Sequence, residues 1–152
     1  PGGYLEAAVD MASWFLPSGK IIVREDFGGK RDEVLHRSRG YNVFSDAVKM
    51  VILIDGGSAS ASEILAGALS ENGIAKLVGA KSFGKGSVQE LVKLTPETSL
   101  KVTIAKWLTP EGHSISDGGL TPDIEVKRTA EEFKSGKDPQ LDKALEILNA
   151  SL

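Results

Sequence analysis

The chain contains no cysteine, and this absence excludes disulfide bridges, thiolate metal sites and a cysteine nucleophile. No apolar run approaches the roughly 18 residues that a membrane-spanning helix needs, and no signal peptide is recognisable. Histidine is scarce as well: the sequence holds only His36 and His113, and neither lies in a motif typical of a catalytic base. A nucleophilic hydroxyl in this chain would therefore need a different side chain to take its proton.

The composition is that of one globular domain. The chain has 152 residues, of which 41% are hydrophobic and 26% charged, so it is long enough to bury a sizeable core. The formal net charge is −3 and the basic residues are scattered, so the sequence shows no basic cluster that would bind nucleic acid or a membrane surface. Because the chain opens at Pro1 without a methionine, we expect it to be a fragment of a longer protein.

Hydrophobic periodicity predicts a mixture of helices and strands. The predicted helices are 4–16, 59–72 and 137–150. The predicted strands are 20–24, 32–37, 49–54, 75–78, 88–94, 99–108 and 123–126, with a hairpin formed by 88–94 and 99–108. Residues 49–54 are predicted to be buried on both faces, 110–122 to form a glycine-rich loop and 128–137 to form a polar linker. The strand–helix–strand unit over 50–78 favours an α/β fold with a right-handed crossover.

A serine stands where the second predicted helix should begin, within the motif GSASASE. Ser60 and Glu63 match the capping box Ser-x-x-Glu, which is the structural interpretation. The catalytic interpretation rests on the strand–turn–helix junction, because amide N–H groups of the first helical turn point outward there. The N–H of Ala61 would then stabilise an oxyanion forming on a bound carbonyl. Ser58 and Ser62 are alternative caps and alternative nucleophiles.

Lys85 stands between two glycines, 25 positions after Ser60. A solvated turn lysine is the simple interpretation, and a phosphate-binding loop is another, since Gly79–Lys85 fits Gly-x4-Gly-Lys. Against the phosphate loop, Gly86 replaces the Ser or Thr that the motif needs, and a strand rather than a helix is predicted to follow. With no suitable histidine, Lys85 is the candidate base for Ser60.

A lysine base must first lose its proton, and an ordinary lysine is almost entirely charged at neutral pH. We therefore expect the Lys85 side chain to be buried, since burial disfavours the ammonium form. Gln89 lies four residues on, and the period of a strand places it on the same side as Lys85, with Glu90 on the opposite side. The neutral Gln89 amide would orient the lysine amine without adding a negative charge. An exposed polar strand residue is the alternative interpretation.

Together these residues resemble the C-terminal processing peptidases, also called tail-specific proteases, over nearly the whole chain. The motif GSASASE, the lysine motif Phe83–Gly86 and Gln89 stand at the family's spacing. Pro1–Gly3 is similar to the end of the family's Asn-Pro-Gly-Gly segment, and Gly119–Asp123 is similar to its Gly-x-x-Pro-Asp element. Asp138–Asp142 resembles the opening of the family's C-terminal helix. Serine, lysine and glutamine at this spacing are a specific signal, whereas each alone is weak.

The resemblance implies a serine endopeptidase that cleaves proteins near or from their C-termini through an acyl-enzyme. It implies that Ser60 is the nucleophile, Lys85 the base and Gln89 the residue that orients Lys85. No metal and no cofactor are required. The backbone amides implied for the oxyanion hole are those of Gly2 or Gly3, with the choice between them open, and of Ala61.

By the same resemblance, the fold is an α/β sheet-and-helix core like that of the Clp-protease and crotonase superfamily, incomplete at its N-terminal side. Residues 1–152 would be the C-terminal part of a catalytic domain. The family's PDZ domain, which reads the substrate's tail, is absent. Because the oxyanion loop Pro1–Gly3 has no upstream residues to hold it and an oxyanion donor must be preorganised, we expect the fragment to be weak or inactive alone. The implied partners are proteins or peptides with apolar C-termini and a homo-oligomer, without nucleic acid or an integral membrane segment. The implied location is extracytoplasmic: a periplasm, a cell wall or a thylakoid lumen.

Two side chains fall outside the implied site. Some family members carry an Asp eleven residues after the nucleophile, where this chain has Glu71, which we expect to be a solvated carboxylate. His113 lies in a loop for which the resemblance implies no role. Two other functions stay open: a crotonase-like acyl-transfer enzyme that uses the oxyanion hole but not Lys85, and a non-catalytic peptide-binding fragment.

Overall fold

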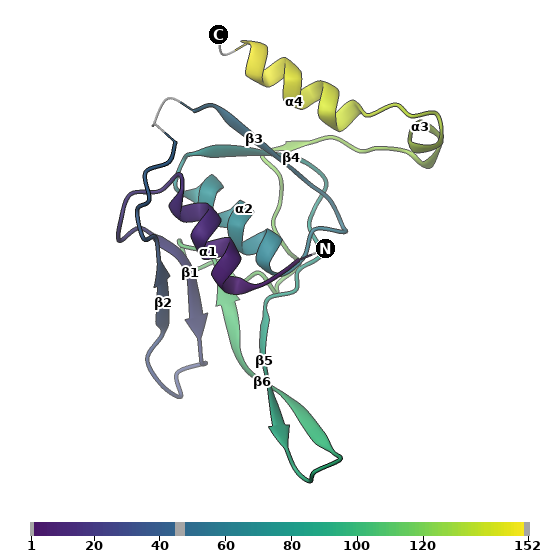
Figure 1. Cartoon of the computed structure of the whole chain (residues 1–152). Helices are drawn as coiled ribbons and strands as arrows, with labels where there is room; N and C mark the ends of the chain where they lie inside the picture. Colours follow the sequence, from purple (N-terminus) through teal and green to yellow (C-terminus); the bar gives the residue numbers. More distant parts are fainter. Residues whose placement is uncertain (1, 45–47, 151–152) are drawn as a thin grey trace.

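The computed structural model describes residues 2–44 and 48–150. Figure 1 shows the arrangement of its helices and strands. Their order is α1 (Leu5–Ser13), β1 (Ile21–Asp26), β2 (Val34–Arg37), β3 (Met50–Ile54), α2 (Ala61–Glu71), β4 (Ala75–Gly79), β5 (Ser87–Lys93), β6 (Ser99–Leu108), β7 (Ile124–Glu125), α3 (Ala130–Lys134) and α4 (Pro139–Ala150). Every predicted helix and strand has a counterpart, and α3 is an addition.

The strands form two sheets. One is antiparallel with the order β2-β1-β6-β5, which confirms the predicted hairpin of β5 and β6. The other has the order β3-β4-β7 and is parallel. Helix α2 connects β3 to β4, so the predicted strand–helix–strand unit is present and the fold is α/β.

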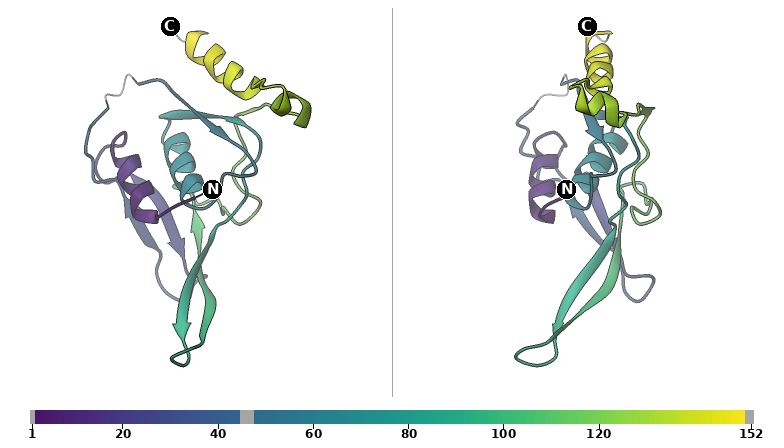
Figure 2. Two further views of the ribbon diagram at one scale, coloured as in Figure 1. Left: turned by 45° about the vertical axis from the view of Figure 1, so that its right-hand side comes forward. Right: turned by 90° about the vertical axis from the view of Figure 1, so that its right-hand side faces the viewer.

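Helices α1 and α2 pack on each other and form the centre of the apolar core (Figure 2). Ala8, Val9 and Ala12 recur at helical spacing on the buried side of α1, and their small size allows α2 to approach closely. Helix α2 contacts β1 of one sheet and β4 of the other, so its position sets the distance between the sheets. Within residues 2–44 and 48–150, no helix is both long and apolar enough to span a membrane.

The β5–β6 hairpin projects from the body of the molecule in every ribbon view (Figures 1 and 2). Side chains on its outer part are exposed, among them Leu91, Leu94 and Leu100. A shift of register between Val88 and Gln89 marks a β-bulge near the root. The segment that carries Lys85 therefore leads directly into an exposed arm.

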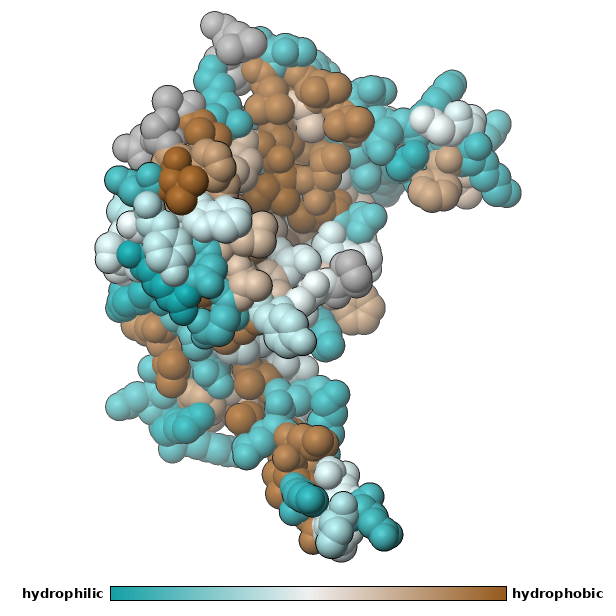
Figure 3. Space-filling view, viewed as in Figure 1, coloured by the Kyte–Doolittle hydropathy of each residue, from teal (hydrophilic) through white to brown (hydrophobic). Residues whose placement is uncertain are grey.

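Strand β3 differs from the expectation that it is buried on both faces. Leu53 is 41% exposed. The reason is the strand order: β3 is an edge strand of the parallel sheet, and α4 covers it only in part. Apolar side chains consequently gather on the surface over β3 and α1 (Figure 3).

The expected linker over 128–137 contains the short helix α3. Thr129 and Glu132 form a capping box, in which the Thr129 hydroxyl accepts the Glu132 N–H and the Glu132 carboxylate accepts the Thr129 N–H. Arg128 pairs with Asp138 at 3.0 Å and lies over the Phe133 ring, which fixes the segment at both ends. The pattern Thr-x-x-Glu was the signal for this helix.

Candidate active site

Ser60 lies at the junction of β3 and α2. After β3 the chain turns through residues 55–59, where the Gly57 N–H donates to the Asp55 carboxylate at 2.8 Å. Ser60 is the N-cap of α2, with φ 58° and ψ −120°. A positive φ is uncommon for a residue with a Cβ, and such strain costs about 1–3 kcal/mol. A serine on a sharp, strained strand-to-helix turn has the geometry of a nucleophile elbow.

The predicted capping box at Ser60 forms only through the Glu63 side chain, and the Ser60 hydroxyl makes no cap hydrogen bond. The Glu63 carboxylate accepts the Ser60 N–H at 2.7 Å, and the Glu63 N–H donates to the Ser60 carbonyl oxygen at 2.9 Å. The cap and the strained turn occur together at one residue. The Ser-x-x-Glu pattern therefore does not argue against a catalytic serine.

Glu63 connects the serine turn with the lysine segment. Its side chain is 1% exposed, and a buried carboxylate needs several donors to offset the water that it loses. Oxygen Oε2 accepts the N–H groups of Ser60 at 2.7 Å and of Lys85 at 3.0 Å. Oxygen Oε1 accepts the Ser82 hydroxyl at 2.5 Å and the Gly84 N–H at 2.7 Å. The Ser-x-x-Glu pattern indicates Glu63 only as a cap, and its second role depends on segments that are distant in the sequence.

The lysine segment is also held against the loop 110–122. The Ser82 hydroxyl accepts the Leu120 N–H at 2.7 Å, and the Ser82 N–H donates to the Leu120 carbonyl at 3.0 Å. A Cβ on Gly84 or Gly86 would lie 2.8 or 2.5 Å from a backbone nitrogen of this loop. The two glycines around the lysine are therefore required by close backbone approach. Strand β5 follows, so the phosphate-loop interpretation lacks the helix that it needs.

Lys85 and Gln89 are both exposed, contrary to the expectation of a buried lysine. Ser82 and Gly86 of the same segment are buried, but the described chain leaves the Lys85 and Gln89 side chains uncovered. Strand period does not place Lys85 and Gln89 on the same side, because Lys85 precedes β5 and the bulge at Val88 interrupts the alternation before Gln89. Within residues 2–44 and 48–150, no hydrogen bond joins the Ser60 hydroxyl, the Lys85 amine and the Gln89 amide. The structure thus brings the segments together through Glu63 without joining these side chains.

Gly2 and Gly3 lie beside the serine turn, whereas Pro1 lies outside the described residues. A Cβ on Gly2 would be 3.3 Å from the Ser60 Cβ, and a Cβ on Gly3 would be 4.0 Å from the Ala61 Cβ. Gly2 has φ 124°, a conformation that favours glycine. Ala61 is the first residue of α2, so its N–H has no acceptor within the helix. The residues expected for the oxyanion hole are therefore neighbours of Ser60.

The model of peptidase family S41 matches residues 1–126. The chain belongs to peptidase family S41. The carboxy-terminal-processing protease of Bartonella bacilliformis is 40% identical over 141 residues, which are 93% of this chain and 32% of that protein. The carboxyl-terminal-processing protease of Synechocystis is 37% identical over 155 residues, covering 100% of this chain and 35% of that protein. Both confirm the resemblance that the serine, lysine and glutamine motifs indicated.

A solved S41 relative supports the same fold. The photosystem II D1 C-terminal processing protease matches with a TM-score of 0.74 and 35% identity, over 83% of this chain and 32% of that one. The α/β core is thus that of the S41 peptidases, within the Clp-protease and crotonase-like folds. The S41 chain described here spans about a third of the length of the curated relatives that it matches.

In this S41 chain, Glu71 is not the solvated carboxylate that we expected. It lies at the end of α2, is 17% exposed, and accepts the Glu111 N–H at 2.8 Å. It also lies 3.0 Å from the Nδ1 atom of His113, and this hydrogen bond, with the charge of Glu71, raises the pKa of His113 above 6.5. Glu71, Glu111 and His113 offer possible metal-ligand atoms within 4.8 Å of one another, but their mutual contacts explain the cluster without an ion.

Proposed function

We propose that this S41 chain is the C-terminal part of the catalytic domain of a serine endopeptidase that cleaves proteins near or from their C-termini. The observation that carries the proposal is the strained turn at Ser60, joined through the buried Glu63 carboxylate to the Lys85 segment. Membership of family S41 and the names of the relatives support the same class.

The proposed reaction is acyl transfer by a serine–lysine dyad. The Ser60 hydroxyl attacks the scissile carbonyl carbon while the neutral Lys85 amine takes the hydroxyl proton. The carbonyl oxygen becomes an oxyanion, stabilised by N–H groups of Gly2 or Gly3 and of Ala61. The C–N bond then breaks, and Lys85 returns the proton to the leaving amine. A water molecule, deprotonated by Lys85, hydrolyses the acyl-enzyme and restores Ser60.

Lys85 and Gln89 are exposed in this chain, so the working arrangement needs a covering element. A bound substrate or another part of the longer protein would displace water from the Lys85 amine and favour its neutral form. Covering would also hold Gln89 against the amine. Glu63 contacts Lys85 through the backbone N–H, which leaves the amine itself free to act.

The proposed substrates are proteins or peptides with apolar C-termini, and the proposed location is extracytoplasmic. The names of the relatives support processing at the carboxy terminus, and the family resemblance implies the apolar tail and the location. The substrate's tail would be read by a PDZ domain elsewhere in the longer protein. Neither a metal nor a cofactor has a part in the proposed steps.

The experiment uses the full-length protein and an unstructured polypeptide with an apolar C-terminus. Ser60→Ala and Lys85→Ala should each abolish cleavage, and the double variant should be no worse than either single one, because the two residues act as a unit. Ser62→Ala and Lys81→Ala are matched controls from the same two segments and should cleave normally.

Three results would contradict the proposal in different ways. Substantial turnover by Lys85→Ala at neutral pH would exclude Lys85 as the base. Thioester hydrolysis that survives Lys85→Ala, without peptide cleavage, would favour a crotonase-like enzyme. Peptide binding without cleavage by the unaltered protein, unchanged in Ser60→Ala, would favour a non-catalytic binding protein.

A further inference from the structure

Strand β5 has a free edge that begins next to the candidate active site. It is the terminal strand of its sheet, and among the described residues it pairs only with β6, from Ser87 opposite Lys106 to Lys93 opposite Ser99. Backbone N–H and C=O groups on its outer side therefore face no other strand. Residues 89–93 are exposed, and the hairpin stands clear of the body (Figures 1 and 2).

This edge has few of the features that usually prevent pairing. Edge strands are commonly very short, interrupted by proline or covered. Strand β5 carries two charged side chains, Glu90 and Lys93, but it has seven residues and no proline, and its bulge is confined to the root at Val88 and Gln89. Beyond the bulge, Glu90 to Lys93 pair regularly with β6 and leave an uninterrupted outer side. Such an edge is a template for another extended chain.

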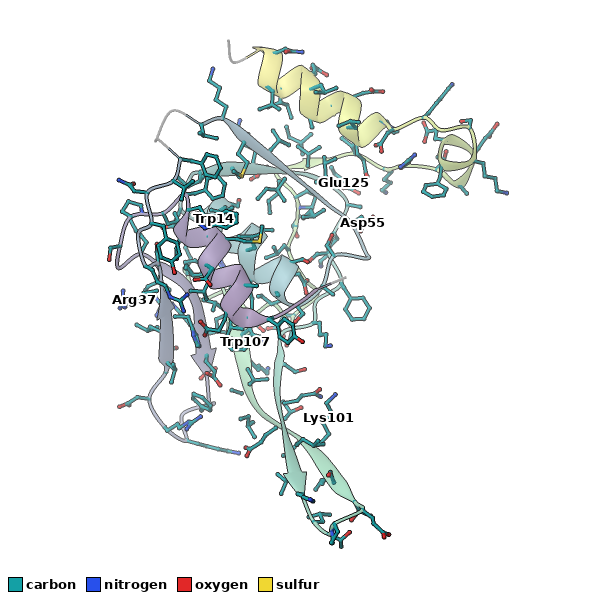
Figure 4. All side chains as sticks on the ribbon, in the orientation of Figure 1. Trp14, Arg37, Asp55, Lys101, Trp107 and Glu125 are labelled. Atoms are coloured by element: carbon teal, nitrogen blue, oxygen red, sulfur yellow. The ribbon has the colours of Figure 1, made fainter. Side chains whose placement is uncertain are left out.

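The edge is continuous with the serine turn. The Lys85 N–H and the Ser60 N–H share oxygen Oε2 of Glu63, and β5 begins two residues after Lys85. The Trp107 N–H donates to the Gly86 carbonyl at 2.7 Å, so the hairpin is closed up to the lysine segment. Figure 4 shows the hairpin running from Trp107 at its base past Lys101 and away from the core. A polypeptide lying along this edge would reach Ser60.

We propose that the polypeptide substrate adds to the outer edge of β5 as an extended strand, with the scissile bond at Ser60 and flanking residues paired along Ser87–Lys93. This proposal rests on the proposed peptidase function. Main-chain hydrogen bonds bind an extended segment of almost any sequence, while neighbouring side chains select alternate residues. Leu91, which is 68% exposed, is placed beside this edge. The competing occupant is the same edge of a second copy.

If the substrate binds by backbone pairing, the effect of blocking its N–H groups should alternate from one residue to the next. Recognition by side chains would not give this alternation. The test uses the full-length protein and peptides that each carry one N-methylated amide, moved one residue at a time from the cleaved bond. Because alternate N–H groups point toward the partner strand, kcat/KM should fall about tenfold or more at every second position and little between them. A profile without this alternation would overturn the proposal.

A shortened hairpin tests the enzyme side. Replacing residues 90–102 by Asn-Gly joins Gln89 to Thr103, which already lie opposite each other, through a turn suited to hairpins. This change removes the outer edge and leaves Gln89 and the Glu63 contacts in place. KM should rise about tenfold for long peptides and stay unchanged for short ones. Shortening the β1–β2 turn at residues 28–31 is the matched control, because β2 is the opposite edge of the same sheet.

A small reagent that acylates serine separates this proposal from the proposed function. Labelling of Ser60 that survives hairpin shortening, together with the raised KM for long peptides, supports strand pairing. Retained labelling with an unchanged KM overturns strand pairing and leaves the peptidase function intact. If Ser60 is not labelled in the unaltered protein, both proposals fail. Dimers in light scattering that disappear on shortening, with KM unchanged, would assign the edge to a second copy.

Discussion

Ser60 occupies a backbone conformation that its own Cβ opposes. The φ of 58° and ψ of −120° persist because the turn after β3, the start of α2 and the Glu63 carboxylate all hold it there. Strain of this kind is common at functional sites, where a side chain must point out of a tight turn. At this position stability therefore favours glycine, whereas the proposed function requires serine.

Replacing Ser60 by glycine should show this conflict. Ser60→Gly removes the Cβ and should be more stable than Ser60→Ala by about 1 kcal/mol, although neither variant has a nucleophile. For a chain of this size the difference corresponds to a Tm shift of about 2–4 °C. Thermal unfolding of both variants measures it. Ser62 lies within α2, so there the order should reverse, with glycine less stable than alanine. If the glycine variant is the more stable one at both positions, or the less stable one at both, Ser60 is not strained.

His113 and Glu71 form a second residue-scale feature, which is sensitive to pH. The hydrogen bond and charge of Glu71 raise the pKa of His113 above 6.5. A raised pKa in the folded state means that the pair stabilises the protein below the unfolded pKa, and that this stabilisation is lost as pH rises through the folded pKa. The pair anchors the loop 110–122 to the end of α2.

We therefore expect His113→Gln to lower Tm at pH 6 and to leave it nearly unchanged at pH 9. Titration by NMR should give the His113 imidazole a pKa above 6.5 in the unaltered chain and a lower one in Glu71→Gln. His36 serves as the internal reference, because Glu71 does not contact it. An unmoved His113 pKa in Glu71→Gln would show that another group is responsible.

At the scale of elements, Glu63 joins three parts of the chain that are distant in sequence. It caps α2, holds the lysine segment through Gly84 and Lys85, and reaches the loop 110–122 through Ser82. These four hydrogen bonds fix the relative placement of the three parts near Ser60. The network is therefore expected to act on the catalytic rate through position.

Ser82→Ala tests this role. The variant removes the hydroxyl that donates to Glu63 and accepts the Leu120 N–H, leaving one part-buried N–H without its acceptor. We expect a loss of about 1–3 kcal/mol in the free energy of unfolding. A displacement of the lysine segment by about 1 Å would lower kcat about 100-fold with little change in KM. Ser70→Ala on α2 is the control, and equal kcat values for the two variants would contradict a positioning role.

At the scale of the whole molecule, apolar surface is concentrated between α1, α2 and β3. A hollow of about 310 Å³ opens there, lined by Met11, Phe15, Ile52, Leu53 and Leu65 among others. Figure 3 shows a continuous apolar area over α1 and β3. Exposed apolar surfaces of this kind commonly mark contacts with another polypeptide. Strand β3 adds a free sheet edge at the same place.

The 152-residue chain should therefore self-associate. Light scattering after size exclusion should show a mass that rises with protein concentration. Leu53→Lys places a charge in the apolar area and should shift the chain toward the monomer. Val34→Lys is the matched control, because Val34 is 42% exposed on β2 of the other sheet. A monomer at all concentrations in the unaltered chain would refute this expectation.

The element pattern could be predicted because it depends on local periodicity. Helix α2, the strands β3 and β4, and the β5–β6 hairpin follow from apolar spacing and turn residues that lie close together in the sequence. The exposure of Leu53 could not be predicted, because an apolar run does not tell a central strand from an edge strand. Helix α3 was predictable from Thr129 and Glu132, although its short length hid the signal.

The sequence by itself determined the family, the α/β class and the residues proposed for catalysis, because motif spacing and periodicity are properties of neighbouring residues. Only the tertiary structure decided the backbone strain at Ser60, the exposure of Lys85, and the shared hydrogen bonds of Glu63. These depend on which distant segments meet: a buried carboxylate acquires its donors from whatever the fold brings within about 3 Å. The residues around any one position do not show which distant segments will approach it.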